Sequence, residues 1–464
     1  MDIPDRMKDG YGINIELIDR AIEAGIDTII TCDNGISALE QTAYAKDKGL
    51  TMIITDHHEI PYEEQPDGSI RTFLPAADAI VNPKQPDCPY PFKGICGAMV
   101  AYKLICGLFQ TIGIPAKETE AFIEFAAVAT IGDVMDLQDE NRILVKEGLK
   151  RIMHTENPGF RALLRANNLE NKTISSYHIG FVLGPCINAS GRLSTAKRAL
   201  DLLLCKEEAE AAVLADDLKA LNDSRKEMTL QGVEQAVELV ENSTWKEDRV
   251  LVIYLPDCHE SLAGIIAGRI REKYNKPVLV LTKAEDGVKG SGRSIETYHM
   301  FRELTKCKSL MTKFGGHPMA AGLSLPEENV DPLRKMLNEN CTLTEEDMAE
   351  KVHIDVPMPV SYVSESLIRQ LSLLEPFGKG NEKPLFAEKN MKIENCRVLG
   401  KNRNVVKMKL YDERGFGREA IWFGNGDEFV RKIKEKDRWT VAYYPSINTF
   451  NGRETIEIVI QKYI

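Results

Sequence analysis

The sequence predicts an α/β protein that begins with a parallel β-sheet and ends in a small β-barrel. Two apolar, β-branched runs near the N-terminus end in polar residues and flank a segment with helical spacing, the pattern of a βαβ unit. The C-terminal part instead alternates apolar and polar residues, as barrel strands do. With 464 residues and 43% apolar content, the chain can bury several cores, so we expect several globular domains.

The first βαβ unit carries polar residues at both strand ends. Residues 27–32 and 50–55 form the two predicted strands, and residues 38–48 form the helix between them. Asp33 follows the first strand, and an Asp-His-His triplet at residues 56–58 follows the second. Because a right-handed crossover puts the carboxyl ends of parallel strands at one edge of the sheet, we expect Asp33 to lie close to the triplet.

A third acid, Asp133, follows Gly132 at the end of the apolar segment 122–131. We expect this segment to be a buried helix that runs into a tight turn, where the glycine lets the backbone approach whatever the acid holds. A lone acid after a strand is more often a helix cap or turn residue, and paired histidines are often a surface feature. Three acids and two imidazoles at element ends of one domain favour a shared divalent-metal site.

The chain changes character after the first domain, which we expect to span residues 1–205. Residues 206–242 carry apolar side chains at three- and four-residue steps between charges, which predicts one long helix or a pair of helices that links two domains. Residues 243–342 repeat a strand, helix and strand order and predict a second, smaller α/β domain. A polar linker marked by prolines, residues 343–383, leads into the C-terminal module, residues 384–464.

The C-terminal module alternates like three strands, a short helix and two further strands. That is the order of an OB-fold, a barrel that often binds single-stranded nucleic acid. The module holds 16 Lys and Arg against 11 Asp and Glu, a local net charge of +5, although the whole chain carries −11. Aromatic and cationic side chains that could stack on bases or neutralise phosphates are Phe416, Trp422, Tyr443, Tyr444, Phe450, Arg403, Lys407, Lys409 and Arg453. Since strand alternation turns every second side chain inward, about half of these aromatics should be barrel core.

Cysteine usage and the termini predict the compartment. The ten cysteines are scattered without a close Cys-x-x-Cys pair, which is typical of reduced thiols rather than of a zinc ribbon or a disulfide framework. The N-terminus lacks the apolar core of a secretory signal, and no stretch is long and apolar enough to span a bilayer. We therefore expect a cytoplasmic protein that has no membrane segment.

Two glycine-rich stretches in the second α/β domain suit phosphate. Residues 290–294, Gly-Ser-Gly-Arg-Ser, offer backbone N–H groups, two hydroxyls and a guanidinium. Residues 315–317, Gly-Gly-His, set an imidazole beside a backbone without side-chain bulk. Taken alone, each stretch is more often an ordinary glycine turn.

The motifs together resemble a known family. Asp33-Asn34-Gly35-Ile36, Asp56-His57-His58 and Gly132-Asp133 resemble successive motifs of the DHH phosphoesterases. Flanking segments narrow the resemblance to the RecJ family of bacterial single-stranded-DNA exonucleases. These segments are Ile3 to Arg6, Asp9 to Gly12, Leu183 to Leu193, Gly290 to Ser294 and Phe314 to Gly322. The resemblance covers nearly the whole chain.

The resemblance implies phosphodiester hydrolysis assisted by two divalent ions, Mn²⁺ or Mg²⁺. Asp33, His57 and Asp133 would be the metal ligands. His58 would face the phosphate or the nucleophile, because neighbouring side chains on an extended segment point to opposite sides. Asp56 would orient an imidazole or the turn, so His58 and Asp56 are expected to serve catalysis.

The resemblance also implies substrate contacts. Ser291 and Arg293 would hold the 5′ phosphate of the strand, and His317 would face the scissile region. The strand's backbone phosphates would be contacted by Arg6, Asn188 and Arg192. For Arg6 and Arg192, a surface salt bridge is the alternative.

The sequence departs from the family pattern in three places. The family's first motif, an aspartate-rich turn, lies upstream of the segment that matches Ile3 to Arg6, so we expect a domain truncated at its N-terminus, with weak or no catalysis. Cys186 stands where many relatives place an arginine, which removes one expected phosphate contact. Ser261 replaces a glycine after His259, which weakens His259 as a substrate contact.

Three functional hypotheses follow. The first is a 5′-to-3′ exonuclease on single-stranded DNA in DNA repair and recombination, monomeric, with a single-strand-binding protein and a helicase as partners. The second is a DHH phosphodiesterase of short oligonucleotides or cyclic dinucleotides, although such relatives are usually shorter and lack the barrel. The third is a catalytically inactive DNA-binding scaffold.

Overall fold

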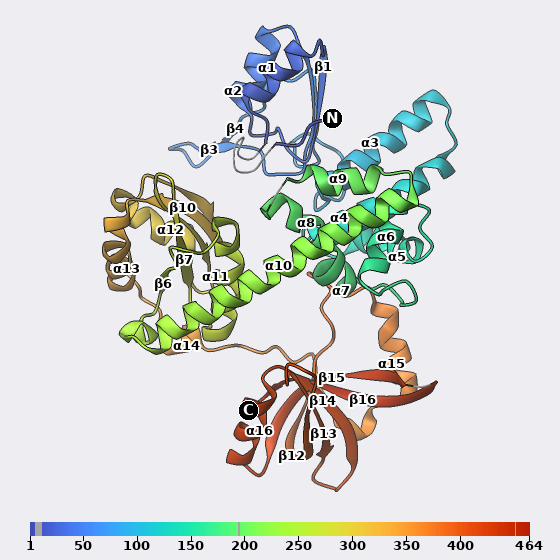
Figure 1. Cartoon of the computed structure of the whole chain (residues 1–464), viewed down its shortest axis with the longest axis vertical. Helices are drawn as coiled ribbons and strands as arrows, with labels where there is room; N and C mark the ends of the chain where they lie inside the picture. Colours follow the sequence, from blue (N-terminus) through green and yellow to red (C-terminus); the bar gives the residue numbers. More distant parts are fainter. Residues whose placement is uncertain (5–11, 194, 451) are drawn as a thin grey trace. The chain divides into compact units, whose positions relative to one another are not determined.

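A computed structural model describes residues 1–4, 12–193, 195–450 and 452–464 (Figure 1). The chain divides into two compact units. The first unit comprises residues 1–55, 59–80 and 152–351. The second comprises residues 56–58, 81–151 and 352–464, so the His57 segment and the C-terminal barrel belong to one unit. Within the described residues, no helix is long and apolar enough to cross a membrane.

The N-terminal sheet has the predicted βαβ unit. Strand β1 (Thr28–Cys32) and strand β2 (Thr51–Thr55) pair in parallel, and helix α2 (Leu39–Asp47) connects them. The sheet order is β1-β2-β5, with β5 at Ala79–Val81. Helix α1 (Ile15–Glu23) supplies Ile18 to a small core with Ala45, Leu50 and Met52. The register pairs Cys32 with Thr55, so both strands end at the same level.

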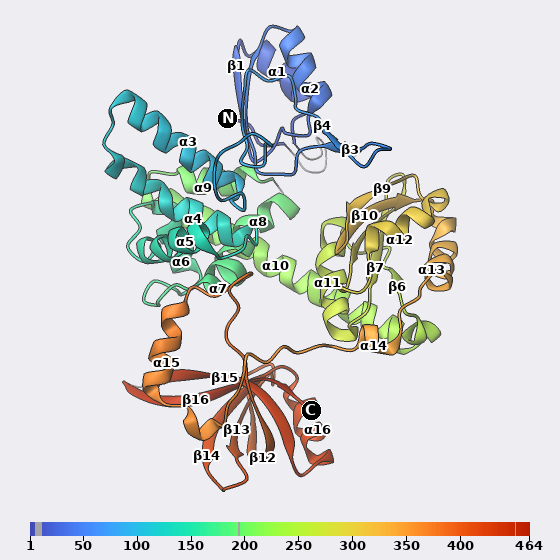
Figure 2. The ribbon, with the colours of Figure 1, turned by 180° about the vertical axis from the view of Figure 1, so that it is seen from behind.

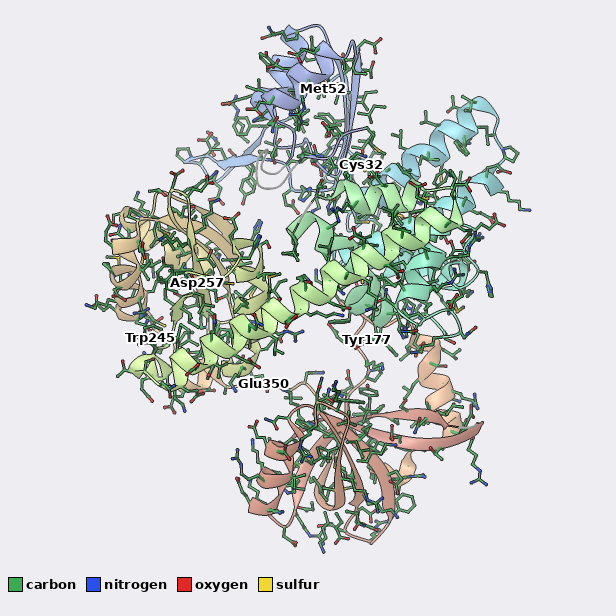
Figure 3. All side chains as sticks on the ribbon, viewed as in Figure 1. Cys32, Met52, Tyr177, Trp245, Asp257 and Glu350 are labelled. Atoms are coloured by element: carbon green, nitrogen blue, oxygen red, sulfur yellow. The ribbon has the colours of Figure 1, made fainter. Side chains whose placement is uncertain are left out.

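The sequence predicts one long helix or a pair of helices over residues 206–242, and the structure has the single helix α10 there. It runs from Glu208 to Glu241 over 34 residues. Its buried positions are Ala211, Ala215, Leu218, Asn222, Gly232, Ala236 and Val240. Shorter helices that pack against it are α6 (Pro158–Ala166), α8 (Gly184–Leu193) and α9 (Lys197–Leu204). Trp245, labelled in Figure 3, follows the C-terminus of α10. The Arg334 guanidinium lies 3.8 Å from the centre of the Trp245 ring.

The smaller α/β domain forms one mixed sheet in the order β6-β7-β8-β10-β9. Strands β6 (Leu251–Tyr254) and β7 (Val278–Ala284) pair in parallel around helix α11 (Ala263–Tyr274), as predicted. The remaining pairs are antiparallel and involve β8 (Gly287–Arg293), β9 (Lys313–His317) and β10 (Ala320–Leu325). Helices α12 (Met300–Lys306) and α13 (Val330–Glu339) add Met300, Leu304, Leu333 and Leu337 to its core. This sheet is seen from opposite sides in Figures 1 and 2.

In the second unit, helices α3 (Gly97–Ile112) and α4 (Ile123–Gly132) precede helix α5 (Asp139–Ile152). Helix α4 is the predicted apolar helix, and Asp133 is its C-cap. Gly132 is the last residue of this helix, and its expected role in letting the backbone approach whatever Asp133 holds stays a prediction. The sharp turn that follows falls at Val134, whose φ is 55°.

The C-terminal module is the predicted OB-type barrel. Its elements are β12 (Phe386–Leu399), β13 (Val405–Tyr411), β14 (Gly417–Phe423), α16 (Gly426–Lys432), β15 (Trp439–Phe450) and β16 (Arg453–Tyr463). The strand order is β11-β12-β13-β14-β16-β15, and an additional β12–β15 pairing closes the barrel. Alternating apolar side chains of these strands fill one core.

Part of the expected linker belongs to this barrel. Strand β11 (Val356–Pro357) pairs with β12, and Val360 and Val363 are buried in the barrel core. The hydroxyl of the fully buried Tyr443 donates a hydrogen bond of 2.7 Å to the Met358 carbonyl. The barrel therefore starts before Pro384. Shorter elements of the chain are β3 (Tyr62–Glu64), β4 (Ile70–Thr72), α7 (Ser176–His178), α14 (Glu345–Met348), α15 (Glu365–Leu371), a π-helix (Ile179–Leu183), and 3₁₀ helices at Ala116–Phe122, Thr244–Glu247, Glu260–Leu262, Lys308–Leu310, Glu327–Asn329, Val360–Tyr362, Ser372–Leu374 and Ile433–Glu435.

A Tyr443→Phe substitution tests this extension of the barrel. It removes the donor to the Met358 carbonyl inside the core, so we expect a local loss of about 1 to 3 kcal/mol. Native-state hydrogen exchange of the barrel amides measures the loss. Tyr362→Phe, at an exposed position (73% exposed), is the control and should change nothing. Equal protection in both variants would show that residues 356–363 do not stabilise the barrel.

Candidate functional site

Asp33 is held in a strained turn directly after β1. Its φ is 64°, a left-handed conformation that aspartate tolerates better than most residues. Its backbone N–H donates to the Thr55 carbonyl at 2.9 Å, so the turn is fixed to the end of β2. Gly35, at φ 111°, is required two residues later, because a Cβ there would lie 3.0 Å from Thr31 Oγ1 and 3.2 Å from Ile54 Cγ2.

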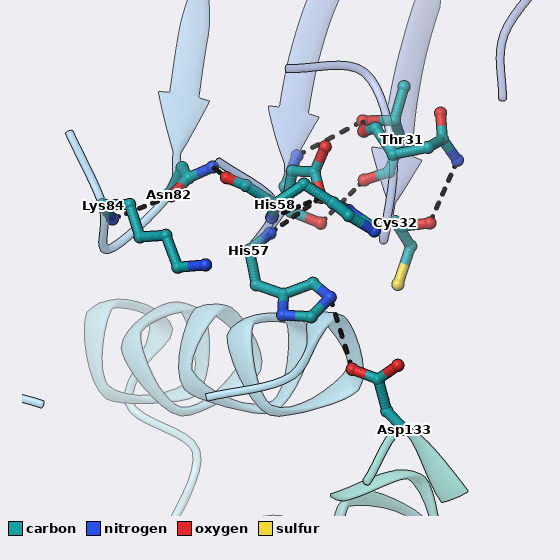
Figure 4. Close-up of polar contacts among 10 residues, drawn as sticks. Thr31, Cys32, His57, His58, Asn82, Lys84 and Asp133 are labelled. Carbon is teal, nitrogen blue, oxygen red and sulfur yellow. Dashed lines mark hydrogen bonds and ion pairs between the residues drawn. The ribbon is translucent and has the colours of Figure 1, made fainter. Parts of the chain in front are cut away.

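The Asp56 carboxylate organises the triplet, whose two histidines, His57 and His58, are labelled in Figure 4. It is 1% exposed, and its Oδ1 accepts hydrogen bonds from the backbone N–H groups of His57 at 2.7 Å and of His58 at 3.2 Å. The same oxygen lies 2.7 Å from His58 Nδ1. A carboxylate on Nδ1 fixes the ring and leaves Nε2 to face a cation or a phosphate. Asp56 is thus placed to orient both the turn and an imidazole.

Asp133 meets the neighbouring imidazole. Its Oδ2 lies 3.4 Å from His57 Nε2, a contact drawn as a dashed line in Figure 4. The His57 side chain is 9% exposed and the Asp133 side chain is 46% exposed. The C-terminal end of α4 therefore brings its carboxylate to the imidazole of the triplet.

Carboxylate and imidazole atoms converge closely enough for one cation. Asp33, His57 and His58 each offer one ligand atom, and these atoms lie within 4.8 Å of one another. The expectation that neighbouring side chains point to opposite sides does not hold here, because β2 ends at Thr55 and the rings of His57 and His58 lie 4.5 Å apart. The set of ligands stays a prediction. The predicted ligands are oxygen and nitrogen donors without a thiolate, a set that suits Mn²⁺ or Mg²⁺.

Asn82 is a supporting residue that the sequence analysis missed. It is 2% exposed, and its Nδ2 donates to the His58 carbonyl at 3.0 Å. Its Oδ1 accepts from the Lys84 N–H at 2.8 Å, and the preceding Val81 carbonyl accepts from the Asp56 N–H at 3.1 Å. The signal was present in the sequence, because Ala-Ile-Val before Asn82 is a third short apolar run that ends in a polar residue.

A pocket of about 1000 Å³ in the first unit is lined by several of the residues predicted to bind the substrate. Its lining includes Arg192, Ser291, Arg293 and His317. The sheet register explains this, since Ala320 pairs with Arg293 on one side and with His317 on the other, which puts both side chains on one face. Gly322 pairs with Ser291 and with Gly315, so the floor between them carries no side chains.

The N-terminus of α11 closes one side of this pocket. A Cβ on Gly264 would lie 2.8 Å from Arg293 Nη2 and 2.9 Å from Ser291 Oγ, so only glycine leaves these groups in place. Burial, together with the nearby Arg271 charge, lowers the pKa of the Arg293 guanidinium from its ordinary value, although an arginine stays charged at neutral pH. Arg192 Nη1 donates to the Ser261 carbonyl at 3.0 Å. Helix N–H groups, a hydroxyl and guanidinium groups together favour an anion.

The other predicted residues lie elsewhere. Asn188 is exposed on α8 and is not among the residues that line the pocket. Arg6 lies outside the described residues. Cys186 is buried and accepts a hydrogen bond from Asn222 Nδ2 at 3.3 Å, so it has a packing role inside the helices. His259 Nδ1 lies 2.8 Å from Ser261 Oγ and caps the short helix there.

The aromatic side chains of the barrel are largely interior. Tyr443 is fully buried, and Trp422 stacks on Phe429 with ring centroids 4.7 Å apart. Tyr444 lies under the Lys383 ammonium at 4.2 Å, and Phe416 is 38% exposed beside Arg418. The Phe450 side chain lies outside the described part. Three of the named cations form ion pairs within the barrel: Arg403 with Asp427, Lys407 with Glu457 and Lys409 with Glu419.

Three family models match the chain in order. Residues 1–132 match the N-terminal domain of the DHH family, residues 247–342 match the DHHA1 domain, and residues 354–462 match the RecJ OB domain. The fold and the Asp-His-His cluster thus define a protein of the DHH phosphoesterase class.

Individual relatives narrow the class. The single-stranded-DNA-specific exonuclease RecJ of Escherichia coli is 34% identical over 99% of this chain and 81% of its own length. RecJ of Bacillus subtilis is 35% identical over 99% of this chain and 56% of its own length. The chain belongs to the RecJ family. It spans little more than half of the Bacillus subtilis relative.

Solved structures agree with this assignment. RecJ from Thermus thermophilus in complex with Mn²⁺ matches with a TM-score of 0.80 at 28% identity, over 97% of this chain and 63% of that one. The same protein in complex with Mg²⁺ matches with a TM-score of 0.74 at 25% identity, over 97% of this chain and 69% of that one. Over the matched part, the architecture described above is therefore similar to that of an experimentally determined RecJ.

Replacing Asn82 tests the support of the metal cluster. Asn82→Ala removes the donor to the His58 carbonyl, so the triplet loosens and the affinity for Mn²⁺ should fall about tenfold or more. Isothermal titration with MnCl₂ measures the change. Asn402→Ala, on an exposed barrel turn, is the control. An unaltered manganese affinity of the Asn82 variant would contradict the supporting role.

Proposed function

We propose that this chain is a metal-dependent exonuclease that hydrolyses single-stranded DNA from its 5′ end in DNA repair and recombination. The observation that carries the proposal is the convergence of Asp33, His57 and His58 on a space the size of one cation. The names of the RecJ relatives supply the reaction type and the substrate class. The pocket around Arg293 would bind the terminal 5′ phosphate, which would explain why digestion starts at the 5′ end.

Asp33, His57 and Asp133 would hold Mn²⁺ or Mg²⁺, and the chemistry of these donors fits both ions. When bound, such an ion supplies an activated water and neutralises charge on the phosphate. Asp56 holds the His58 ring through Nδ1, which leaves Nε2 to donate to a phosphate oxygen. Asn82 holds the backbone of His58, so the imidazole stays in place while the substrate moves. These residues orient and stabilise, and hydrolysis needs such orientation within a few tenths of an ångström.

The pocket of the smaller domain would bind the terminal 5′ phosphate. A terminal phosphate has more free oxygens and more negative charge than an internal diester, and the pocket offers donors to match. Ser291 and Arg293 lie beside Gly264 in the first turn of α11, so a phosphate bound by them would also lie near this turn. His317 stands on the same face and would meet the following part of the strand. Arg192, and by resemblance Arg6 and Asn188, would contact phosphates of the backbone.

Single-stranded DNA is the substrate that fits the C-terminal barrel. An OB-type barrel with a local net charge of +5 attracts a polyanion, although several of its cations are already ion-paired. All ten cysteines lie within the described residues as thiols outside any disulfide, which suits the reducing cytoplasm. We further propose a monomer that works with a single-strand-binding protein and a helicase, because the enzyme needs strands that have been separated.

The barrel and the cluster of proposed metal-binding side chains favour the exonuclease hypothesis over the two alternatives. A phosphodiesterase of short oligonucleotides or cyclic dinucleotides has little use for a strand-binding barrel beside its catalytic residues. An inactive scaffold has no need to keep an Asp and two His around one cation-sized space. The exonuclease hypothesis accounts for both features.

Asp133→Ala should abolish manganese-dependent digestion of single-stranded DNA. The substitution removes the carboxylate at His57, so the expected loss is about a hundredfold or more if Asp133 is a metal ligand. Release of nucleotides from a 5′-labelled strand measures it. Asp216→Ala, at an exposed position of α10, is the control. Undiminished digestion by the Asp133 variant would remove this residue from the site.

Arg293→Ala should weaken the preference for a 5′-phosphorylated strand. Loss of a charge-assisted phosphate contact costs about 1.5 to 3 kcal/mol, or roughly a 10- to 100-fold change in binding. Binding of strands with a 5′ phosphate and with a 5′ hydroxyl is compared by fluorescence anisotropy. Arg302→Ala, on α12 and exposed, is the control. The same preference for the phosphate in the Arg293 variant would place the terminal phosphate elsewhere.

A further inference from the structure

The segment 372–381 leaves the barrel and returns to it within a few residues. On its N-terminal side, Ile368 and Leu371 of α15 pack against the barrel core, and Arg369 forms an ion pair with Glu454 at 2.8 Å. On its C-terminal side, the Lys383 ammonium lies 4.2 Å from the centre of the Tyr444 ring of β15. Both ends of the segment therefore contact the barrel.

Helix α5 is hydrogen-bonded to the middle of the same segment through Arg142. Arg142 points its guanidinium at three successive carbonyls: Nη2 donates to Leu373 at 2.9 Å and to Glu375 at 3.3 Å, and Nε donates to Leu374 at 3.3 Å. A planar fork with fixed donors suits such an array, and a lysine could not reproduce it. Asn381 Nδ2 donates to the Leu374 and Pro376 carbonyls, both at 2.9 Å, which keeps the segment folded against itself.

A second set of contacts joins the same segment to the turn that follows Asp133. The Leu137 N–H donates to the Lys379 carbonyl at 2.7 Å, and Gln138 Nε2 donates to the Gly380 carbonyl at 2.8 Å. The Lys379 ammonium pairs with the Asp136 carboxylate at 3.0 Å. Residues 136–138 and 142 are thus tied to a segment that is more than 200 positions later in the sequence.

Two glycines make the close approach possible. A Cβ on Gly378 would lie 2.7 Å from Leu137 Cδ1, and a Cβ on Gly380 would lie 3.0 Å from Asp136 Cβ. Gly380 also has a φ of 71°, a conformation that favours glycine. Leu137 is 2% exposed, so the contact is packed rather than incidental.

We propose that the segment 372–381 is a positioning clamp that ties the barrel to the turn carrying Asp133. The proposal rests on the proposed metal-dependent function. Asp133 ends α4, Val134 makes the sharp turn, and Leu137 is already held by the clamp. Movement of the segment would displace the turn, and a carboxylate displaced by about 1 Å loses most of its value to a metal site. Arg142 and Asn381 are accordingly positioning residues that touch neither substrate nor metal.

The proposal is tested by loosening the clamp from both of its sides. Arg142→Ala removes the grip on the helix side, and Asn381→Ala loosens the segment on the barrel side. For each variant of the whole chain, we expect the Mn²⁺ dissociation constant from isothermal titration to rise about tenfold. Hydrogen exchange at the Leu137 amide should speed up, and kcat for digestion should fall while KM for the strand stays unchanged.

Two controls and a folding check accompany these variants. Lys150→Ala removes an exposed side chain from the same helix, and Gly107→Ala adds a Cβ where nothing lies within 4 Å. Both should leave manganese affinity unchanged. Circular dichroism establishes that every variant is folded at the assay temperature, and a variant that is not folded is replaced by Gln138→Ala, which removes one bond of the clamp.

The outcomes separate this proposal from the proposed function. Unchanged manganese affinity in both clamp variants, together with faster exchange at Leu137, would overturn the clamp and leave the exonuclease hypothesis intact. Weaker manganese binding in both clamp variants, with the unsubstituted chain digesting duplex DNA as fast as single strands, would support the clamp and overturn the exonuclease hypothesis. A chain that binds no manganese at all would overturn both.

Discussion

The parallel pairing of β1 with β2 is the constraint on which the site depends. Cys32 lies opposite Thr55, so the residues that follow the two strands leave the sheet at one level. The Asp33 N–H then bonds to the Thr55 carbonyl, and the chain continues from Thr55 into the Asp56 turn. A shift of one residue in this register would turn the polar residues to the wrong face. The placement of the proposed metal site therefore depends on the strand register rather than on any single side chain.

Contacts from other parts of the chain support the residues that follow β1 and β2. Asp56 and Asn82 hold the His58 ring and its backbone, and α4 delivers Asp133 to His57. The turn after Asp133 is in turn held by a segment of the barrel domain. Metal sites depend on such outer contacts nearly as much as on the ligands themselves. The inclusion of the barrel in the same compact unit as His57 follows from these contacts.

Much of the fold could be predicted from local patterns. The βαβ unit and the order of strands and helix along the barrel sequence follow from periodicity, and motifs that resemble a known family single out Ser291, Arg293 and His317. The rest could not, because it depends on contacts between residues far apart in the sequence. Asn82 and the 372–381 segment look like loop residues until their partners are known, and the barrel edge at β11 is too short to show alternation. The rings of His57 and His58 lie close together because β2 ends at Thr55, so strand alternation does not apply to these two residues.

The most direct test of this account is the position of manganese in a crystal of the chain grown with MnCl₂. Anomalous difference density measured near the manganese absorption edge would locate the ion without reference to any activity. The account predicts a peak at the carboxyl ends of β1 and β2, within coordinating distance (about 2.0 to 2.3 Å) of an Asp33 oxygen and a His57 nitrogen. A manganese peak bound only elsewhere, with Asp33 and His57 turned away from each other, would contradict it.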